Sequence, residues 1–195
     1  MLENKRIAIL ATDGFEESEL FEPKSILELA GAKVDIISIQ KGSIKAWNKD
    51  NWGRSIEVDH QLRNVDAKNY DALVLPGGVM NPDKLRIDED AIMFASHFAS
   101  AGKPIAAICH GPWLLIELDI LQGRQITSWP SLKSDLTNAG AYWVDSEVVV
   151  DNGLITSQKP ADIPFFCKKL IEEILEGPKH PVKFKRLSQE NAIMT

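Results

Sequence analysis

Short hydrophobic runs alternate along the chain with longer stretches whose apolar residues recur at helical spacing. The runs at 7–11, 72–75 and 105–108 are apolar throughout, which is typical of strands buried on both faces of a parallel sheet. A further strand is predicted at 34–39. Because these strands alternate with predicted helices, the pattern predicts an α/β fold, a doubly wound sandwich with a mostly parallel sheet.

The predicted helices are placed by apolar spacing and by the residues that start and stop them. Pro23 suits the first turn of a helix that stops at Gly31. The same reasoning predicts helices at 91–101, 113–118 and 161–175. Together with the strands, they form repeated strand–helix–strand units.

Two segments have the pattern of β-hairpins. The stretch 45–60 combines scattered aromatics with alternating polar and apolar positions. Later, strands at 147–150 and 154–157 flank the turn signature Asp151-Asn152-Gly153. We expect both segments to pair antiparallel.

Length and composition fit one domain. The chain has 195 residues, of which 44% are hydrophobic and 26% charged, within the globular range. We predict a single domain over 1–176 and a tail over 177–195. The formal net charge of -6 argues against a nucleic-acid partner or a polybasic membrane anchor, since both need a positive surface.

The two cysteines, Cys109 and Cys167, do not form a disulfide framework, and no Cys-x2-Cys metal spacing occurs. The first residues lack a signal-peptide layout, and no stretch is long enough to span a bilayer. These features predict a cytoplasmic, reduced protein that needs no metal or cofactor.

Three loops with unusual residues follow strands of the predicted sheet: 13–19, 76–82 and 109–113. In doubly wound folds, ligands bind at the carboxyl ends of the strands. We therefore expect these loops to converge on one site.

Cys109 is the candidate nucleophile. It stands between a buried strand and a helix, as in a nucleophile elbow, with Gly111 allowing a sharp turn and Pro112 preset for the first helical turn. A helix N-terminus lowers a thiol pKa from about 8.5 to roughly 3.5–7.5, so Cys109 is predicted to be a thiolate at neutral pH. The alternative is a small buried hydrophobe, which is the role expected for Cys167.

His110 is the candidate acid or base, since imidazole titrates near neutral pH; alternatively it only caps the helix. The backbone N–H groups of Gly77, Gly78 and His110 are candidate oxyanion donors. Among the acidic residues of the first loop, which in most proteins form a solvated face, Glu19 is the candidate neutral acid that hydrogen-bonds the thiolate. Glu16 and Trp113 are secondary candidates.

Four motifs resemble one known family. The chain is similar to bacterial ThiJ/PfpI proteins, a branch of the flavodoxin-like, class I glutamine-amidotransferase-like superfamily, over about 5–175. The matching motifs are Ala107-Ile108-Cys109-His110-Gly111-Pro112, Pro76-Gly77-Gly78, Gly14-Phe15-Glu16-Glu17-Ser18-Glu19 and Asn138-Ala139-Gly140-Ala141.

The resemblance implies roles for individual residues. Cys109 takes the nucleophile position, His110 the adjacent histidine, Glu19 the carboxylate that bonds the thiol and Gly78 the oxyanion loop. In PfpI-type oligomers, a carboxylate from a neighbouring subunit reaches the Cys–His pair, and Asp83 takes that position here. Its loop has one extra residue, and aspartate is one methylene shorter than the family's glutamate. The resemblance also implies a homo-oligomer, dimeric or larger.

The resemblance leaves several functions open. One is a stress-response cysteine hydrolase acting on small carbonyl compounds or their protein adducts, as a glyoxalase or deglycase, or on amide bonds as a peptidase. The other is a non-enzymatic redox sensor or chaperone-like protein with an oxidisable Cys109. Glutamine amidotransferase chemistry is disfavoured, because no His-x-Glu pair follows Cys109. The small-carbonyl reading is favoured, since the sequence shows no long apolar groove for a peptide.

Overall fold

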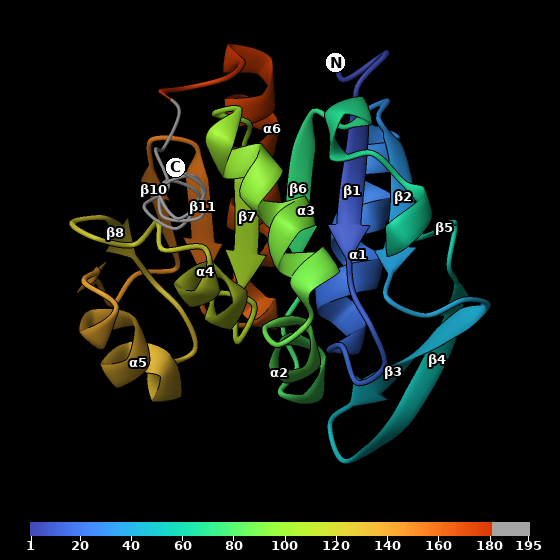
Figure 1. The fold of residues 1–195 in the computed structure, drawn as a ribbon, viewed down its shortest axis with the longest axis horizontal. Coiled ribbons are helices and arrows are strands. Elements are labelled where there is room, and N and C mark those ends of the chain that lie inside the picture. Colours follow the sequence, from blue (N-terminus) through green and yellow to red (C-terminus); the bar gives the residue numbers. More distant parts are fainter. Residues whose placement is uncertain (181–195) are drawn as a thin grey trace, which may run out of the picture.

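A seven-stranded sheet forms the centre of the molecule, with the strand order β10-β11-β7-β6-β1-β2-β5 (Figure 1). The computed structural model describes residues 1–180, so residues 181–195 of the tail predicted over 177–195 lie outside the described residues. Only β10 runs antiparallel to its neighbour in this sheet. The strands are β1 (Arg6–Leu10), β2 (Lys33–Ser38), β5 (His60–Gln61), β6 (Ala72–Leu75), β7 (Ile105–Ile108), β10 (Val148–Asp151) and β11 (Leu154–Ser157).

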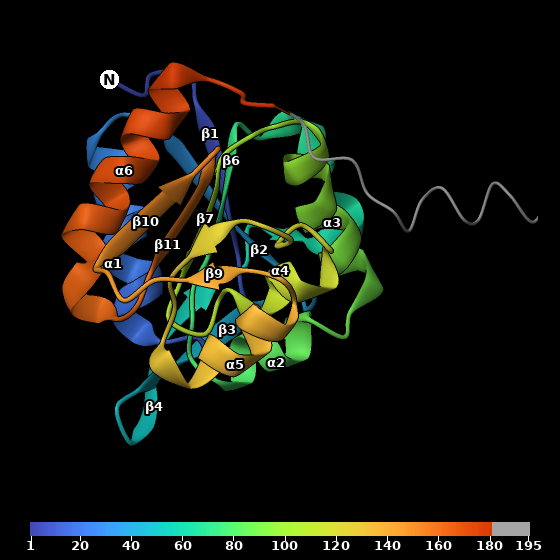
Figure 2. The same ribbon diagram turned by 90° about the vertical axis from the view of Figure 1, so that its left-hand side faces the viewer.

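Helices cover both faces of this sheet, and α1 and α6 lie on the face opposite α3 and α4 (Figure 2). This three-layer arrangement confirms the predicted doubly wound α/β fold. The helices are α1 (Glu17–Leu29), α2 (Met80–Leu85), α3 (Glu89–Ser100), α4 (Trp113–Glu117), α5 (Lys133–Asn138) and α6 (Ile163–Glu176). Short 3-10 turns are η1 (Leu62–Asn64), η2 (Ala67–Asn69), η3 (Pro130–Leu132) and η4 (Pro160–Asp162).

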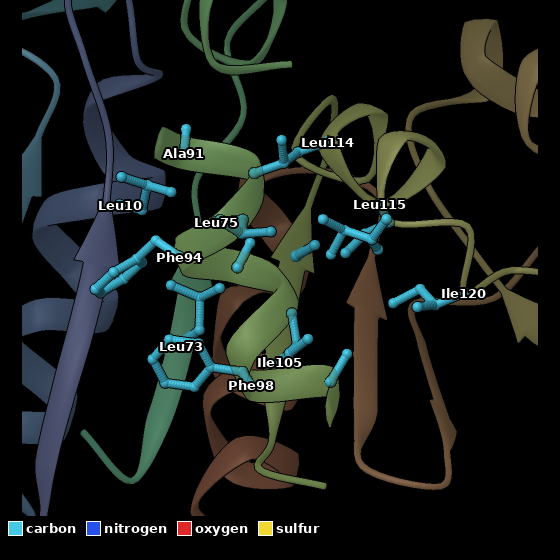
Figure 3. Close-up of a cluster of buried hydrophobic side chains, with 14 of the residues drawn as sticks. Leu10, Leu73, Leu75, Ala91, Phe94, Phe98, Ile105, Leu114, Leu115 and Ile120 are labelled. Carbon is cyan, nitrogen blue, oxygen red and sulfur yellow. The ribbon is translucent and has the colours of Figure 1, made fainter. Parts of the chain in front are cut away.

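The central strands are apolar on both faces because each face packs against a separate core. In β1, Ile7 and Ile9 belong to the core beneath α1 and α6, whereas Ala8 and Leu10 belong to the core beneath α3 and α4. Figure 3 shows the second core, where Leu10 lies near Phe94 of α3. Uninterrupted apolar runs therefore mark the strands in the interior of the sheet.

Both predicted hairpins are present. β3 (Ser43–Asn48) and β4 (Asn51–Glu57) pair antiparallel and project from the lower edge of the molecule in Figure 1. β10 and β11 also pair antiparallel. Their turn residues Asn152 and Gly153 have φ values of 44° and 82°, the pair of positive φ angles that a type I′ turn requires.

The prediction that Pro23 lies in the first turn of its helix is wrong, because α1 begins earlier, at Glu17. The Glu16 carboxylate caps the helix by accepting a hydrogen bond from the Glu19 N–H at 2.9 Å, which satisfies one free donor of the first turn. Pro23 lies inside the helix. The early start brings Glu19 into the first turn, at the carboxyl end of the sheet.

Several short elements have no counterpart in the predicted pattern. They include α2, α5 and the two-stranded pair β8 (Gln125–Ile126) and β9 (Tyr142–Trp143). Each is too short for an apolar period to stand out. α2 and α5 lie near the carboxyl ends of the strands, at the lower edge of Figure 1, whereas β8 lies beside β10.

We expect the core beneath α3 to contribute strongly to stability. Phe98 is fully buried, and replacing such a ring with alanine removes apolar burial and leaves a cavity. Phe98→Ala should therefore lower the free energy of unfolding by about 3–5 kcal/mol. The matched control is Leu29→Ala in α1, which is 85% exposed and should change it by less than about 0.5 kcal/mol. Urea denaturation measures both, and similar losses for the two variants would contradict this assignment of the core.

Candidate active site

Cys109 directly follows β7 and has a backbone conformation that non-glycine residues rarely take. Its φ is 61°, in the left-handed region that costs about 1–3 kcal/mol and is concentrated at functional sites. Hydrogen bonds hold it on both sides: its N–H donates to the Ser157 carbonyl at 3.0 Å, and the Trp129 N–H donates to the Cys109 carbonyl at 2.9 Å. The turn from β7 into α4 thus has the predicted elbow geometry.

The elbow depends on the missing side chain at Gly111. A Cβ at this position would lie 2.3 Å from the carbonyl oxygen of Leu75, at the end of the neighbouring strand β6. Because the contact is with a backbone atom, a side chain at this position would displace strand β6. Glycine therefore lets the turn after β7 pack directly against β6 and sets Cys109 beside the loop that follows β6.

Glu19 reaches Cys109 from the first turn of α1. Its side chain is fully buried, and its Oε2 accepts a hydrogen bond from the Gly77 N–H at 2.8 Å. Its other oxygen, Oε1, is buried without a conventional hydrogen-bond partner among residues 1–180. The carboxyl group interacts with the Cys109 thiol closely enough for each to influence the pKa of the other.

The electrostatics of this pair favour neutral groups in the resting chain. Burial raises the pKa of the Glu19 carboxyl to about 8, and the charge of Glu16 acts in the same direction. Burial also raises the pKa of the Cys109 thiol, and a negative charge on Glu19 raises it further. The prediction that Cys109 is a thiolate at neutral pH is therefore wrong for the resting site. The helix behind it, α4, has only five residues, so the stabilisation it offers does not offset burial.

The loop after β6 contributes backbone donors. The Gly77 N–H, one of the three predicted oxyanion donors, donates to Glu19 Oε2 at 2.8 Å. The N–H groups of Gly78 and His110 lie close enough to the Cys109 sulfur to oppose part of the rise in its pKa. Those two donors converge next to the sulfur, where the oxyanion of an adduct would form.

Glycine is required at both positions of this loop. A Cβ at Gly77 would lie 2.5 Å from Glu19 Oε2 and 2.7 Å from the Cβ of Cys109. At Gly78, φ is 75° and a Cβ would lie 2.3 Å from the carbonyl oxygen of Gly14. The backbone therefore fits between the carboxyl group and the thiol where no larger residue could.

Asn81 holds this loop in place, and the sequence pattern gave no sign of it. Its side chain is fully buried. The amide nitrogen donates to the carbonyls of Pro76 and Gly77 at 2.9 and 3.2 Å, and its Oδ1 accepts from the Thr12 N–H at 2.8 Å. Asn81 thus connects the loop after β6 to the end of β1.

His110 lies beside the thiol between two indole rings. Its Nδ1 is 3.3 Å from the Cys109 sulfur, and its Nε2 is 3.4 Å from the Ser131 hydroxyl. The ring is stacked with Trp129 at 6.5 Å between centroids and meets Trp113 edge-on at 5.4 Å. Burial lowers the pKa of His110, which favours neutral imidazole, the form that accepts a proton.

The remaining predicted residues, Asp83, Glu16 and Trp113, lie at the edge of the site. Asp83 is exposed on α2 and makes no hydrogen bond or ion pair through its carboxylate within the described chain. Glu16 caps α1, and its Oε2 also accepts from the Ser18 hydroxyl. Trp113 contacts His110 and donates from its indole to Asp135 at 2.8 Å. Glu16 and Trp113 therefore support the neighbours of the thiol.

No group of three or more His, Cys, Asp or Glu side chains among residues 1–180 is arranged to hold a metal ion. Cys167, on α6, is buried in the core and is a free thiol, like Cys109. Three hollows in the surface are lined by residues other than Cys109, so we place the site by its chemical groups rather than by the size of a hollow.

Comparisons with known proteins agree with the fold. The profile of the DJ-1/PfpI family matches residues 5–173. Deglycase PH1704 of Pyrococcus horikoshii is 40% identical over 167 residues, 86% of this chain and 98% of the relative. YraA of Bacillus subtilis, whose name proposes a cysteine protease, is 42% identical over 166 residues, 85% of this chain and 96% of the relative.

A solved structure agrees as well. The crystal structure of a two-domain protein from Anabaena variabilis, with DJ-1/ThiJ/PfpI-like and ferritin-like domains, superposes with a TM-score of 0.81 at 36% identity. The match covers 86% of this chain and 47% of that one. The chain belongs to the DJ-1/PfpI family. No helix among residues 1–180 has both the length and the apolar character to cross a membrane.

Protonation of Glu19 in the folded chain gives stability a distinctive pH dependence. Its folded pKa of about 8 lies above the unfolded value near 4.3, so the folded state binds more protons between these values. This contribution to the free energy of unfolding is complete below the pKa of Glu19 in the unfolded chain. It is lost as pH rises through the pKa of Glu19 in the folded chain. Glu19→Gln should remove this decline, which amounts to at most about 1.4 kcal/mol per pH unit.

The measurement is urea denaturation at intervals from pH 5 to 9, comparing the slopes of the free energy of unfolding. The matched control is Glu22→Gln, an exposed glutamate on the same helix, which should keep the wild-type slope. A Glu19→Gln slope equal to that of the wild type would show that Glu19 is ionised throughout.

Proposed function

We propose that this protein is a cysteine-dependent enzyme that acts on small carbonyl compounds or their adducts on proteins, as a glyoxalase or deglycase. The observation that supports it most is that several reactive groups surround one strained thiol. They are an imidazole nitrogen at 3.3 Å, a buried carboxyl group with a raised pKa, and two backbone N–H donors. The name of the Pyrococcus relative, a deglycase, supports the same choice.

The first step uses the imidazole and the backbone donors. His110 Nδ1 takes the proton of the Cys109 thiol, and the sulfur adds to an aldehyde carbon to form a hemithioacetal. The negative charge that develops on the carbonyl oxygen is stabilised by the N–H groups of Gly78 and His110. Because burial lowers the pKa of His110, the ring is neutral before the step and ready to accept the proton.

The second stage moves a proton within the adduct. A base removes the C–H proton next to sulfur and a proton returns to the adjacent carbonyl carbon, which converts the hemithioacetal of a ketoaldehyde into a thioester. Water then hydrolyses the thioester to a hydroxy acid and restores the thiol. Glu19, with a pKa of about 8, exchanges protons readily near neutral pH, so it and His110 are the groups proposed for this shuttle.

Peptidase activity uses the same opening chemistry on an amide and is the second candidate, since the name of YraA proposes a cysteine protease. We favour the small carbonyl substrate. The sulfur is largely buried, with Cys109 only 9% exposed, so a compact aldehyde reaches it more easily than an amide within a polypeptide.

The proposal extends to assembly and location. Asp83 is exposed on α2. In the proposed homo-oligomer, its carboxylate reaches the thiol site of a neighbouring copy. Both cysteines are free thiols, which suits a reducing cytoplasm. Nucleic acid and membrane are left out of the proposed partners, in keeping with the net charge of -6.

The activity is tested on methylglyoxal and on a peptide whose arginine carries a methylglyoxal adduct. Wild-type protein should consume both, and Cys109→Ala should reduce turnover to background because no other group in the site replaces the sulfur. His110→Ala should lower kcat by about 10²–10⁴-fold, the usual contribution of a positioned acid or base. Chromatography of the hydroxy acid product measures the rates.

Cys167→Ala is the matched control, since it removes the other thiol of the chain without touching the site. It should keep the wild-type rate. Turnover that survives in Cys109→Ala would contradict the mechanism. If wild-type protein cleaves casein and does not consume methylglyoxal, peptidase activity would be favoured instead.

The non-enzymatic alternative has its own measurement. If Cys109 served as a redox sensor, mild peroxide would add oxygen to it in wild-type protein but not in Cys109→Ala. We expect slow oxidation, because the resting thiol is protonated and largely buried. Rapid oxidation seen by intact mass, in a protein without carbonyl turnover, would favour the sensor.

A further inference from the structure

His110 has a second partner on the side away from the thiol. Its Nε2 lies 3.4 Å from the hydroxyl oxygen of Ser131, while its Nδ1 lies 3.3 Å from the Cys109 sulfur. The contact with Ser131 is long for a hydrogen bond between nitrogen and oxygen, whereas the contact with the larger sulfur atom has an ordinary length. The three side chains form a continuous line from thiol to imidazole to hydroxyl within one chain.

We propose that Ser131 is a positioning residue that holds His110 in the tautomer able to accept the Cys109 proton, so that the line Cys109–His110–Ser131 is complete within a single subunit. The inference rests on the proposed function, since it assigns a role in activating the same thiol. It differs from the role expected for Asp83, whose carboxylate would come from a neighbouring copy.

The tautomer follows from the donors and acceptors available. Nδ1 can accept the thiol proton only if it has a free lone pair, so the ring proton must be on Nε2. The Ser131 oxygen accepts a hydrogen bond from that Nε2–H. When the thiol proton moves to Nδ1, the ring becomes an imidazolium and the bond to Ser131 becomes charge-assisted, which strengthens it.

The backbone places Ser131 firmly for this task. It lies in the 3-10 turn η3 (Pro130–Leu132), between a proline with restricted φ and the buried Leu132. The preceding Trp129 donates its N–H to the Cys109 carbonyl at 2.9 Å and stacks on the imidazole. The segment that holds the hydroxyl is therefore attached to the same turn that holds the thiol.

Charged groups around the imidazole have partners of their own. Asp135 of α5 accepts the indole N–H of Trp113, and Arg86 of α2 is paired with Glu117 of α4 at 2.6 Å. On the opposite side, Glu19 lies behind the sulfur. Asp83 and Lys133 are exposed on α2 and α5. The group in contact with Nε2 is the neutral hydroxyl of Ser131, at 3.4 Å, and burial lowers the pKa of the ring.

The test is the rate of Cys109 alkylation by iodoacetamide as a function of pH, which needs no substrate and is independent of deglycase or peptidase turnover. Ser131→Ala should lower the rate at pH 7 by about two- to tenfold, the range expected for one hydrogen bond, and shift the profile to higher pH. Ser131→Thr, which keeps the hydroxyl, should restore it. Ser131→Asp should shift the profile to lower pH, because a carboxylate at Nε2 stabilises imidazolium.

Ser134→Ala is the matched control, since Ser134 is an exposed serine on the adjoining helix α5, and it should leave the profile unchanged. Ser131→Ala and Ser131→Asp profiles that superimpose on the wild type would overturn the proposal. So would a profile that shifts in Asp83→Asn but not in Ser131→Ala, because the partner of Nε2 would then be the carboxylate of another copy. Carbonyl turnover assayed in parallel shows separately whether the proposed function holds.

Discussion

The contact between the buried Glu19 carboxyl and the Cys109 thiol is the constraint on which the rest of the site depends. Two acidic groups that share a desolvated space cannot both be ionised at low cost, and here burial raises the pKa of each. The pair therefore rests in a neutral state. In the proposed mechanism, the imidazole at 3.3 Å is the base that removes the thiol proton.

The fold brings these groups together at a modest cost in strain. The carboxyl ends of β1, β6 and β7 meet at one edge of the sheet, where α1, the loop after β6 and the elbow after β7 converge. Cys109 has a positive φ because hydrogen bonds to its N–H and its carbonyl hold it there. Gly77 fits between Glu19 and Cys109 and donates its N–H to the carboxyl group, so the same backbone both separates and orients the pair.

Much of this architecture could be predicted from the sequence. The apolar runs that became β6 and β7 coincide with those strands, because burial on both faces leaves no polar position. Glu19 was singled out for its place just beyond the first strand, and the structure brings it to the thiol. Helices such as α2 and α5 were missed, since six residues give too little periodicity to recognise.

The details of the site could not be predicted for a different reason. Whether the Gly77 N–H faces an adduct or a carboxylate depends on how loops from separate strands meet, and sequence spacing contains no such information. The same holds for Asn81, which joins two loops, and for Ser131, which reaches His110 from a distant segment. The ionisation of Cys109 was misjudged because the short helix behind it was visible in the sequence, whereas the burial around it was not.

At neutral pH, Glu19 retains its proton in the resting protein, since burial raises its pKa to about 8. Infrared difference spectroscopy between wild-type protein and Glu19→Gln measures this directly, because a protonated carboxyl and a carboxylate absorb at separate frequencies. We expect a carboxylic acid carbonyl band for Glu19 at pH 7 that fades as pH rises through about 8. A carboxylate band from Glu19 at pH 7, with no acid band, would contradict it.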